Sequence, residues 1–263
     1  MQPREILISL AIKLSGDWNL IYQSLIRKEN YEDEQEVLDN CRNLKCQAVT
    51  IMDQEYPAQL KRVQKPPFVL FYYGDISIIQ NTRDCIGVIG SRHPTRYGIF
   101  NTQKLVSNLP KQAVVVSGMA IGIDSVAHKS ALSSGHKTVA VLGSGIDVCY
   151  PTSNQDLYDE ISQFNLVLSE YPPGTPPCIP FFPARNRIIA GLSNSLLVTE
   201  ATVKSGTMIT VEVALQLGLD VMCLPSSDLG NSGTNYCIKQ GAFLVETFDD
   251  VNYFFAKQNY YGN

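Results

Sequence analysis

Short apolar runs alternate with small or polar clusters along most of the chain. The runs are Cys85–Ile89, Ala113–Val116, Thr138–Leu142, Asn165–Leu168 and Leu196–Val198. Each run ends in a cluster that contains glycine, serine, threonine, arginine or glutamate, and a segment with helical spacing follows. Alternation of strands with helices predicts an α/β fold, in which helices cover a parallel sheet. Ligands of such sheets bind at the carboxyl ends of the strands, where these clusters gather.

Residues 1–65 show a different pattern, with charge-rich helical segments and a single glycine, Gly16. This pattern predicts a small all-helical domain. Its apolar residues at helical spacing are Leu7, Leu10, Ile12, Leu14, Leu20, Ile21, Leu25 and Ile26. We expect them to form the core of this domain rather than a surface for a partner.

Two adjacent prolines, Pro66 and Pro67, break any helix and begin the second domain. We expect this domain to cover residues 66–256 and a loose tail to cover residues 257–263. Within the domain, Tyr171–Pro180 is a loop stiffened by five prolines.

Composition narrows the class of protein. Of the 263 residues, 44% are hydrophobic and 17% are charged, which suits a packed core. No apolar run approaches the roughly 20 residues of a membrane helix, and Met1–Glu5 lacks a signal-peptide pattern, so we expect a soluble cytoplasmic protein. The seven cysteines form no C-x-x-C pair and the three histidines lack the spacing of zinc ligands, so we expect no metal and no cofactor.

The net charge of −4 argues against a protein that coats nucleic acid with a uniformly basic surface. Cations nevertheless lie in or beside the predicted loops at the strand ends. They are Arg92, Arg96, Arg185, Arg187 and Lys204. Such a grouping predicts an anion site that depends on position and not on total charge.

Three strand-end loops suit an anionic ligand. They are Gly90-Ser91-Arg92, Ser117-Gly118 and Gly143-Ser144-Gly145. Glycine lets backbone N–H groups approach a phosphate, and arginine adds a planar set of donors. For Gly90–Arg92, an ordinary tight turn with a surface arginine is an equally good interpretation.

The strongest local signal is Arg185-Asn186-Arg187, which we place in the first turn of a helix that begins near Pro183. Two guanidinium groups are costly to bury without an anionic partner. Phe181-Phe182 just before them offers stacking faces, as in proteins that bind single-stranded nucleic acid. The alternative is that these phenylalanines are core residues and that the arginines pair with Glu170 and Glu200.

Lys204-Ser205-Gly206-Thr207 begins another predicted helix. Hydroxyl groups and free N–H groups meet there, which suits a second anion contact. Glu200 and Glu212 flank it and are the carboxylate pair to consider for acid–base chemistry. We expect instead that Glu200 braces the arginines and that Glu212 is solvated.

Asp124 is expected to cap the helix after the second strand, and His128 follows one turn later. We prefer a structural cap and a packed histidine to a catalytic pair, because no nucleophile can be placed near them. The motifs G-x-S-x-G, G-x-G-x-x-G and G-x-x-x-x-G-K-[ST] are absent. A dinucleotide dehydrogenase or a P-loop ATPase is therefore not expected.

In their order, these motifs resemble the DNA-processing protein A family (DprA, also called Smf). The matching stretches include Gly87–Arg92, Val116–Asp124, Val139–Asp147, Phe182–Ser193 and Ser205–Thr210, within residues 56–245. The resemblance implies an extended Rossmann-like parallel sheet with helices on both faces, behind a sterile-alpha-motif-like helical domain. It also implies a non-enzymatic homodimer that binds single-stranded DNA without sequence preference and loads RecA recombinase onto incoming DNA in natural transformation.

The resemblance places DNA contacts at Ser91, Arg92, Ser117, Gly118, Phe182, Arg185 and Asn186. Together with the anion motifs, the full predicted site adds Gly143, Arg187, Lys204, Ser205, Gly206 and Thr207. Many relatives carry a lysine where this chain has Ile179, so we expect one phosphate contact to be lost or moved to Lys204 or Arg96.

Two other functions stay open. The first is an enzyme similar to nucleoside-monophosphate phosphoribohydrolases, in which Arg92, Gly206-Thr207 and Glu200 or Glu212 would act; the G-G-x-G-T turn of those enzymes is not reproduced here. The second is a scaffold whose helical domain binds partners.

Overall fold

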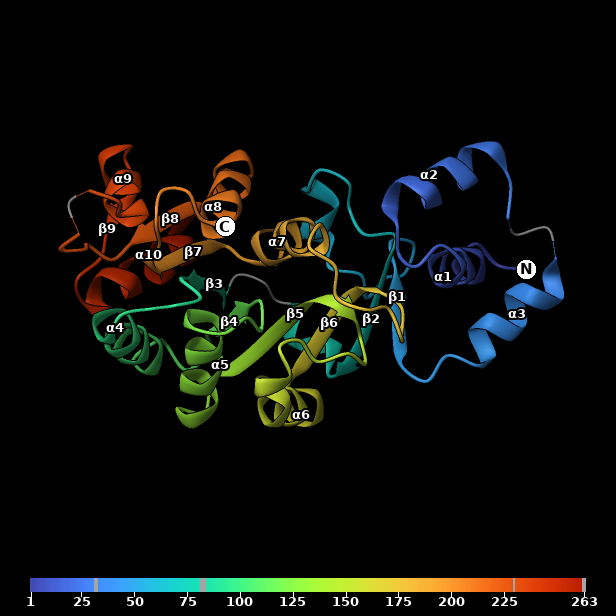
Figure 1. The fold of residues 1–263 in the computed structure, drawn as a ribbon, viewed down its shortest axis with the longest axis horizontal. Coiled ribbons are helices and arrows are strands. Elements are labelled where there is room, and N and C mark those ends of the chain that lie inside the picture. Colours follow the sequence, from blue (N-terminus) through green and yellow to red (C-terminus); the bar gives the residue numbers. More distant parts are fainter. Residues whose placement is uncertain (31–32, 81–83, 229, 262–263) are drawn as a thin grey trace.

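The computed structural model describes residues 1–30, 33–80, 84–228 and 230–261, with side chains as far as Phe255. In these residues, nine strands form a single sheet in the order β1-β2-β6-β5-β4-β3-β7-β8-β9. Helices cover both faces of the sheet (Figure 1). The predicted α/β class is therefore confirmed.

The strands are β1 (Gln47–Thr50), β2 (Val69–Gly74), β3 (Cys85–Gly90), β4 (Val114–Ser117), β5 (Lys137–Gly145), β6 (Leu166–Tyr171), β7 (Ser195–Glu200), β8 (Asp220–Cys223) and β9 (Phe243–Leu244). The α-helices are α1 (Pro3–Lys13), α2 (Trp18–Arg27), α3 (Glu34–Arg42), α4 (Arg96–Ser107), α5 (Ile123–Ser133), α6 (Gln155–Phe164), α7 (Phe181–Leu192), α8 (Gly206–Gln216), α9 (Gly233–Lys239) and α10 (Phe248–Tyr261). Short 3₁₀ turns include η1 (Ala58–Arg62), η2 (Ile76–Ile79) and η4 (Thr152–Asn154).

The order of the strands reverses at the middle of the sheet. β3 pairs with both β4 and β7 in parallel, and the chain continues through β5 and β6 on one side and β8 and β9 on the other. β1 and β2 extend the β6 edge in antiparallel pairing. In open α/β sheets, ligands bind at the carboxyl ends of the strands where this reversal occurs. Here that position is the end of β3 and β7.

The N-terminal helices share their core with the sheet. Leu10 of α1 and Phe71 of β2 are fully buried in one cluster with Leu142 of β5. The prediction of an all-helical segment over residues 1–65 is wrong at Gln47–Thr50, which form β1. Val49 and Thr50 are buried against the sheet, and this burial favours an extended conformation for β-branched side chains.

Two residues expected in the helical core are on the surface. Leu20 and Ile26 of α2 are 47% and 63% exposed, because α2 turns Ile21 and Ser24 inward instead.

The C-terminal segment is helical where a loose tail was predicted. α10 continues through residue 261, and residues 262–263 lie outside the described residues. Val251, Phe254 and Phe255 are buried together with Leu105 of α4. Their burial at helical spacing stabilises this last helix against the sheet.

A buried ion pair connects α7 to the sheet. Arg187 Nη2 donates to the two carboxylate oxygens of Glu170 at 2.6 and 2.7 Å, and Arg187 Nε donates to the carbonyl oxygen of Lys65 at 2.9 Å. The two charged side chains are 12% and 6% exposed. Burial raises the pKa of Glu170, and Arg187 opposes this shift. The pair therefore joins α7, β6 and the segment before β2.

Removing one partner of this pair should destabilise the fold strongly. Arg187→Met leaves the Glu170 carboxylate buried without its cation, so we expect a loss of about 3–5 kcal/mol in the free energy of unfolding. Equilibrium urea unfolding measures this loss. Arg42→Ala is the control, since Arg42 forms an exposed ion pair with Asp39 at 3.9 Å. It should lower the free energy of unfolding by less than about 0.5 kcal/mol. Equal effects of the two substitutions would contradict the assigned role.

Candidate functional site

The start of α8 is attached to both β3 and α7 at the carboxyl edge of the sheet. Thr207 Oγ1 donates to the carbonyl oxygen of Gly90 at 3.0 Å. Asn186 Nδ2 donates to the carbonyl oxygen of Gly206 at 3.4 Å. Three predicted segments, far apart in sequence, therefore meet at one place.

Arg185 lies beneath this edge. Its side chain is 4% exposed, and Nη1 donates to the carbonyl oxygens of Gly118 and Val141. Burial lowers the pKa of Arg185 to about 10, and the nearby carboxylate of Asp124 opposes the shift. The side chain therefore keeps its charge at neutral pH and joins α7 to the end of β4 and the middle of β5.

The prediction that Arg185-Asn186-Arg187 lies in the first turn of its helix is wrong. α7 begins at Phe181, so these residues lie in the second turn and Pro183 is the third helical residue. Pro180 is the N-cap residue. Its fixed φ already suits a helix start, so the helix begins earlier than Pro183 indicated.

An exposed cation and two aromatic rings lie above this buried arginine. The guanidinium carbon of Arg92 lies 5.5 Å from the centre of the Phe182 ring, which is 5.5 Å from the centre of the Tyr150 ring. Tyr150 is 49% exposed. We call Arg92, Phe182 and Tyr150 the aromatic platform. A cation over a ring face is a favourable arrangement that leaves both groups available to a ligand.

Glycine is required under this platform. A Cβ at Gly143 would lie 2.8 Å from the ring of Phe182, so the ring rests directly on the backbone of β5.

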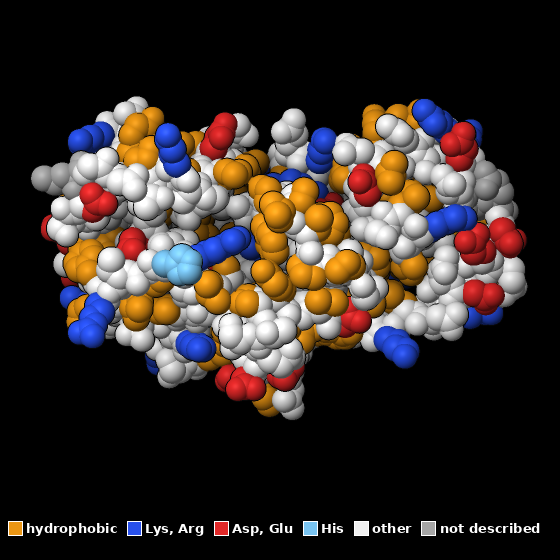
Figure 2. All heavy atoms as spheres, viewed as in Figure 1, with side chains coloured by type: hydrophobic (Ala, Val, Ile, Leu, Met, Phe, Trp, Pro, Cys, Tyr) orange, Lys and Arg blue, Asp and Glu red, His pale blue; other side chains and the backbone are white. Residues whose placement is uncertain are grey.

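In the view of Figure 2, hydrophobic side chains gather over the centre of the face, with Lys, Arg and His side chains beside them. Phe181, in contrast, stacks on Tyr171 at 4.0 Å.

Tyr150 was not among the site residues predicted from the sequence. It follows the glycine loop at the end of β5 and precedes Pro151. The available signal was an aromatic residue in a loop at the end of a predicted strand. Its position depends on the fold of the loop, which the motif alone did not give.

The predicted serines differ in their exposure. Ser117 is fully buried, and its hydroxyl donates to the carbonyl oxygen of Val88 at 2.6 Å, so its side chain does not reach the surface. Ser91 is half-buried, and its N–H donates to the carbonyl oxygen of Glu200 at 2.7 Å.

The loop Gly118–Gly122 is fixed by polar contacts. Asp124 Oδ2 accepts the N–H of Ala120 at 3.3 Å, and Asn154 Nδ2 donates to the carbonyl oxygen of Met119 at 2.9 Å. Met119 is fully buried and has a φ of +60°. A non-glycine residue keeps this conformation only where its surroundings impose it, which is typical of functional loops.

Asp124 is not the N-cap residue that the sequence predicted. Gly122 is the N-cap of α5, with φ +81°, and Asp124 lies in the first turn. A Cβ at Gly122 would lie 2.3 Å from the carbonyl oxygen of Ser91. The close approach of the two loops therefore requires glycine at the cap.

His128 is a packed histidine, as the preferred interpretation held. Its Nδ1 lies 2.7 Å from Thr138 Oγ1, and its buried Nε2 has no partner among the described residues. Burial lowers the pKa of His128 to about 3, and the charge of Arg185 adds to this shift.

Arg187 and the acidic residues lie apart from the platform. The pairing of an arginine with Glu170 is confirmed for Arg187, which therefore is not free at the predicted site. Glu200 accepts instead from the N–H and Oγ1 of Thr95, at 3.1 and 2.6 Å. Glu212 is exposed and lines a cavity between α8 and α9. The two carboxylates considered for acid–base chemistry thus do not face one site.

The start of α8 remains open to a ligand. Lys204 and Gly206 are exposed, and nothing lies within 4 Å of a Cβ built on Gly206. The hydroxyl of Ser205 donates to the carbonyl oxygen of Thr202 at 2.8 Å and does not cap the helix. Free N–H groups and one cation therefore face solvent here, as an anion site requires.

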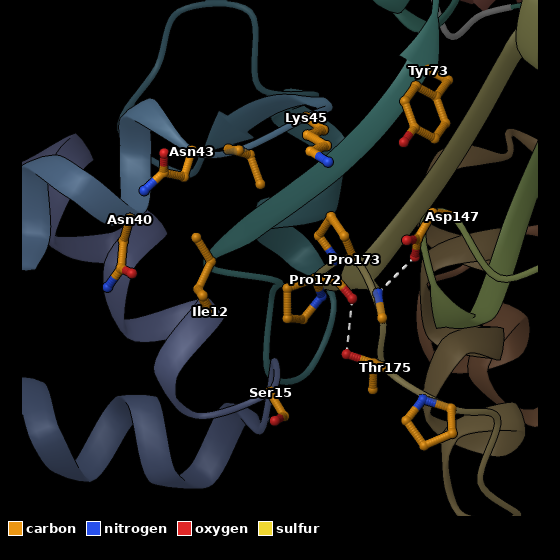
Figure 3. A pocket seen from close by; sticks show the side chains of 13 residues that line it. Ile12, Ser15, Asn40, Asn43, Lys45, Tyr73, Asp147, Pro172, Pro173 and Thr175 are labelled. Atoms are coloured by element: carbon orange, nitrogen blue, oxygen red, sulfur yellow. Dashed lines mark hydrogen bonds between the residues drawn. The ribbon is translucent and has the colours of Figure 1, made fainter.

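A cavity of about 490 Å³ lies away from these residues (Figure 3). It separates the N-terminal helices from the proline loop and is lined by residues such as Ile12, Asn43, Lys45 and Pro173. Asp147 at its rim accepts the N–H of Gly174 at 2.7 Å. None of the predicted site residues lines it.

Among the side chains that the structure describes, no three His, Cys, Asp or Glu residues form a group able to hold a metal ion. No described helix combines the length and the apolar character needed to cross a membrane.

A family model described as DNA recombination-mediator protein A matches residues 47–256. The DNA processing protein DprA of Streptococcus pneumoniae is 43% identical over 204 residues, which are 77% of this chain and 72% of that protein. DprA of Bacillus subtilis is 37% identical over 210 residues, covering 77% of this chain and 69% of that protein. The chain spans 53% of the Escherichia coli protein Smf, with 36% identity.

Solved structures agree with these matches. The X-ray structure of DprA from S. pneumoniae superposes with a TM-score of 0.77 and 34% identity, covering 94% of each chain. DprA from Helicobacter pylori, whose structure describes a single-stranded DNA binding mode, gives a TM-score of 0.73 and 30% identity. That match covers 82% of this chain and 98% of the other.

Gly118→Ala should disturb the support beneath the site. The new Cβ would lie 2.5 Å from the guanidinium of Arg185, so the buried arginine or the loop must shift, at a cost of about 1–3 kcal/mol. Thermal unfolding measures the loss. Gly206→Ala, where the same atom meets open space, is the matched control and should not lower stability, since alanine at a compatible helical position gains about 0.4–1 kcal/mol. A Gly118→Ala protein as stable as the control would refute this packing.

The buried His128 should make stability depend on pH. Its pKa is about 3 in the folded protein against an ordinary 6.5, so the unfolded chain binds the proton first as pH falls. The stabilisation is complete above about pH 6.5 and should decrease by about 2 kcal/mol between about pH 8 and pH 5. Urea unfolding over this range should give a pH slope smaller by about one proton in His128→Gln. An unchanged slope would show that His128 does not titrate as assigned.

Proposed function

Because the chain belongs to the DNA recombination-mediator protein A family, we propose that it binds single-stranded DNA without sequence preference. The observation that carries the proposal is the aromatic platform, where exposed Arg92 lies over Phe182 at the carboxyl edge of the sheet. Stacked rings accept any base, and a cation beside them contacts phosphate.

The proposed contacts follow from exposure. Arg92, Phe182 and Tyr150 supply the cation and the rings, and the start of α8 supplies Lys204 and free N–H groups for phosphate. Ser91, Gly143, Asn186 and Thr207 border this surface. Gly118, Ser117 and Arg185 act from below, by holding the loops in place.

We further propose that the protein delivers the bound strand to a RecA-type recombinase during natural transformation, in the cytoplasm. The family description as a recombination mediator supports this role. We also propose that it acts as a homodimer. The β9 edge supports this, because Phe243 and Leu244 are 40% and 47% exposed beside the cavity of about 630 Å³ between α8 and α9.

The platform residues should control affinity for single strands. Arg92→Ala should weaken binding to all sequences alike. It should also reduce the slope of the logarithm of the association constant against the logarithm of the salt concentration by about 0.7. Phe182→Ala should weaken binding about tenfold, as for the loss of one stacked base. Fluorescence anisotropy with labelled single strands, at two salt concentrations and against duplex competitor, measures these effects.

Lys111→Gln is the matched control, since Lys111 is exposed before β4, at the opposite edge of the sheet. The same two platform variants should lose any stimulation of recombinase ATP hydrolysis on single strands. Wild-type affinity in an Arg92→Ala, Phe182→Ala double variant would overturn the proposed function.

A further inference from the structure

α2 presents a row of stacked rings near the surface. Trp18 stacks with Tyr22 and with Phe68, with ring centres 5.0 and 5.2 Å apart and ring planes within 17° and 20° of parallel. Trp18 Nε1 donates to the carbonyl oxygen of Pro66 at 2.8 Å, which fixes the indole. Tyr22 is 46% exposed and therefore lies on a rigid base with part of its ring open to solvent.

Cations lie beside these rings. Lys65 Nζ lies 5.5 Å from the centre of the Trp18 ring. Lys61 and Arg62 are exposed on η1. Residues 56–74 hold these three cations and no Asp or Glu, in a chain whose net charge is −4. We call Trp18, Tyr22, Arg62 and Lys65 the α2 strip.

α7 contacts the α2 strip and also carries Phe182 of the aromatic platform. The first turn of α7, which carries the platform's phenylalanine, contributes Pro183 and Ala184 to a cavity of about 440 Å³. Arg62 lines the same cavity from the other side. One turn further along α7, Arg187 Nε donates to the carbonyl oxygen of Lys65 at 2.9 Å. A strand that leaves the platform over the start of α7 would meet Arg62 next.

We propose that the α2 strip is a second contact surface for the same single DNA strand, with phosphates on Arg62 and Lys65 and one base on the open face of Tyr22. The proposal rests on the proposed function. The positive charge of residues 56–74 complements phosphate, and it favours a nucleic acid over an apolar protein segment as the occupant. Stacking combined with cations binds a strand without reading its sequence.

Trp18 provides the first test, because it is the only tryptophan in the chain. Oligothymidylates of about 6 and about 20 nucleotides lie within and beyond the ~4–16 nucleotides that one binding module covers. We expect fluorescence anisotropy to show that both strands bind. Only the longer strand should reach the α2 strip and change the emission of Trp18.

Substitutions provide the second test. Tyr22→Ala should weaken binding of the longer strand about tenfold and leave the shorter strand unaffected, whereas Tyr22→Phe keeps the ring and should bind like wild type. Leu20→Ala is the matched control, since Leu20 is 47% exposed on the same helix. Arg62→Gln should lower the salt slope for the longer strand only, and Lys111→Gln should not. Thermal unfolding of each variant verifies the fold.

The outcomes separate the two proposals. The α2 strip is overturned, and the platform stays in place, if the longer strand binds the wild-type protein without changing Trp18 emission. The same outcome requires that Tyr22→Ala and Arg62→Gln leave the affinity for the longer strand unchanged. Wild-type protein that binds neither strand overturns both. Weaker binding of the short strand by Tyr22→Ala would place Tyr22 within the first site and would also overturn a separate surface.

Discussion

The guanidinium of Arg185 is the interaction on which the site depends. It is buried beneath the carboxyl edge of the sheet, bonded to the carbonyl oxygens of Gly118 and Val141 and balanced by Asp124. A buried cation of this kind is stable only while its hydrogen-bond partners stay in place. The loops that carry Arg92 and Phe182 are therefore arranged around a fixed charge below the surface, and the exposed groups need little reorganisation to meet a ligand.

Much of the fold was predictable, because strand and helix spacings repeat clearly between Cys85 and Leu224. The strand-end clusters also indicated where the candidate site would lie, since parallel strands bring their carboxyl ends to one edge. Sequence did not reveal β1. Its four residues follow a charged helix, and pairing with β2 together with the burial of Val49 and Thr50 stabilises them as a strand.

The roles of individual arginines were less predictable. Arg185 and Arg187 stand two positions apart, which on a helix places them on opposite sides. Arg185 donates to the carbonyl oxygen of Gly118 after β4, whereas Arg187 donates to Glu170 of β6 and to the segment before β2. The motif contains both residues, but only the packing of α7 decides which side chain lies beneath the loops and which forms an ion pair. Tyr150 was missed for a similar reason, since its loop brings it to Phe182 through tertiary contacts alone.

The core that α1 shares with β2 and β5 has a consequence for how the chain unfolds. Leu10 and Phe71 lie in one apolar cluster, so either part without the other would expose a surface that was buried. Domains that are shuffled between genes are joined by few contacts and fold alone. The helices at the start of this chain do not meet that description, so we expect them to unfold together with the sheet, as one cooperative unit.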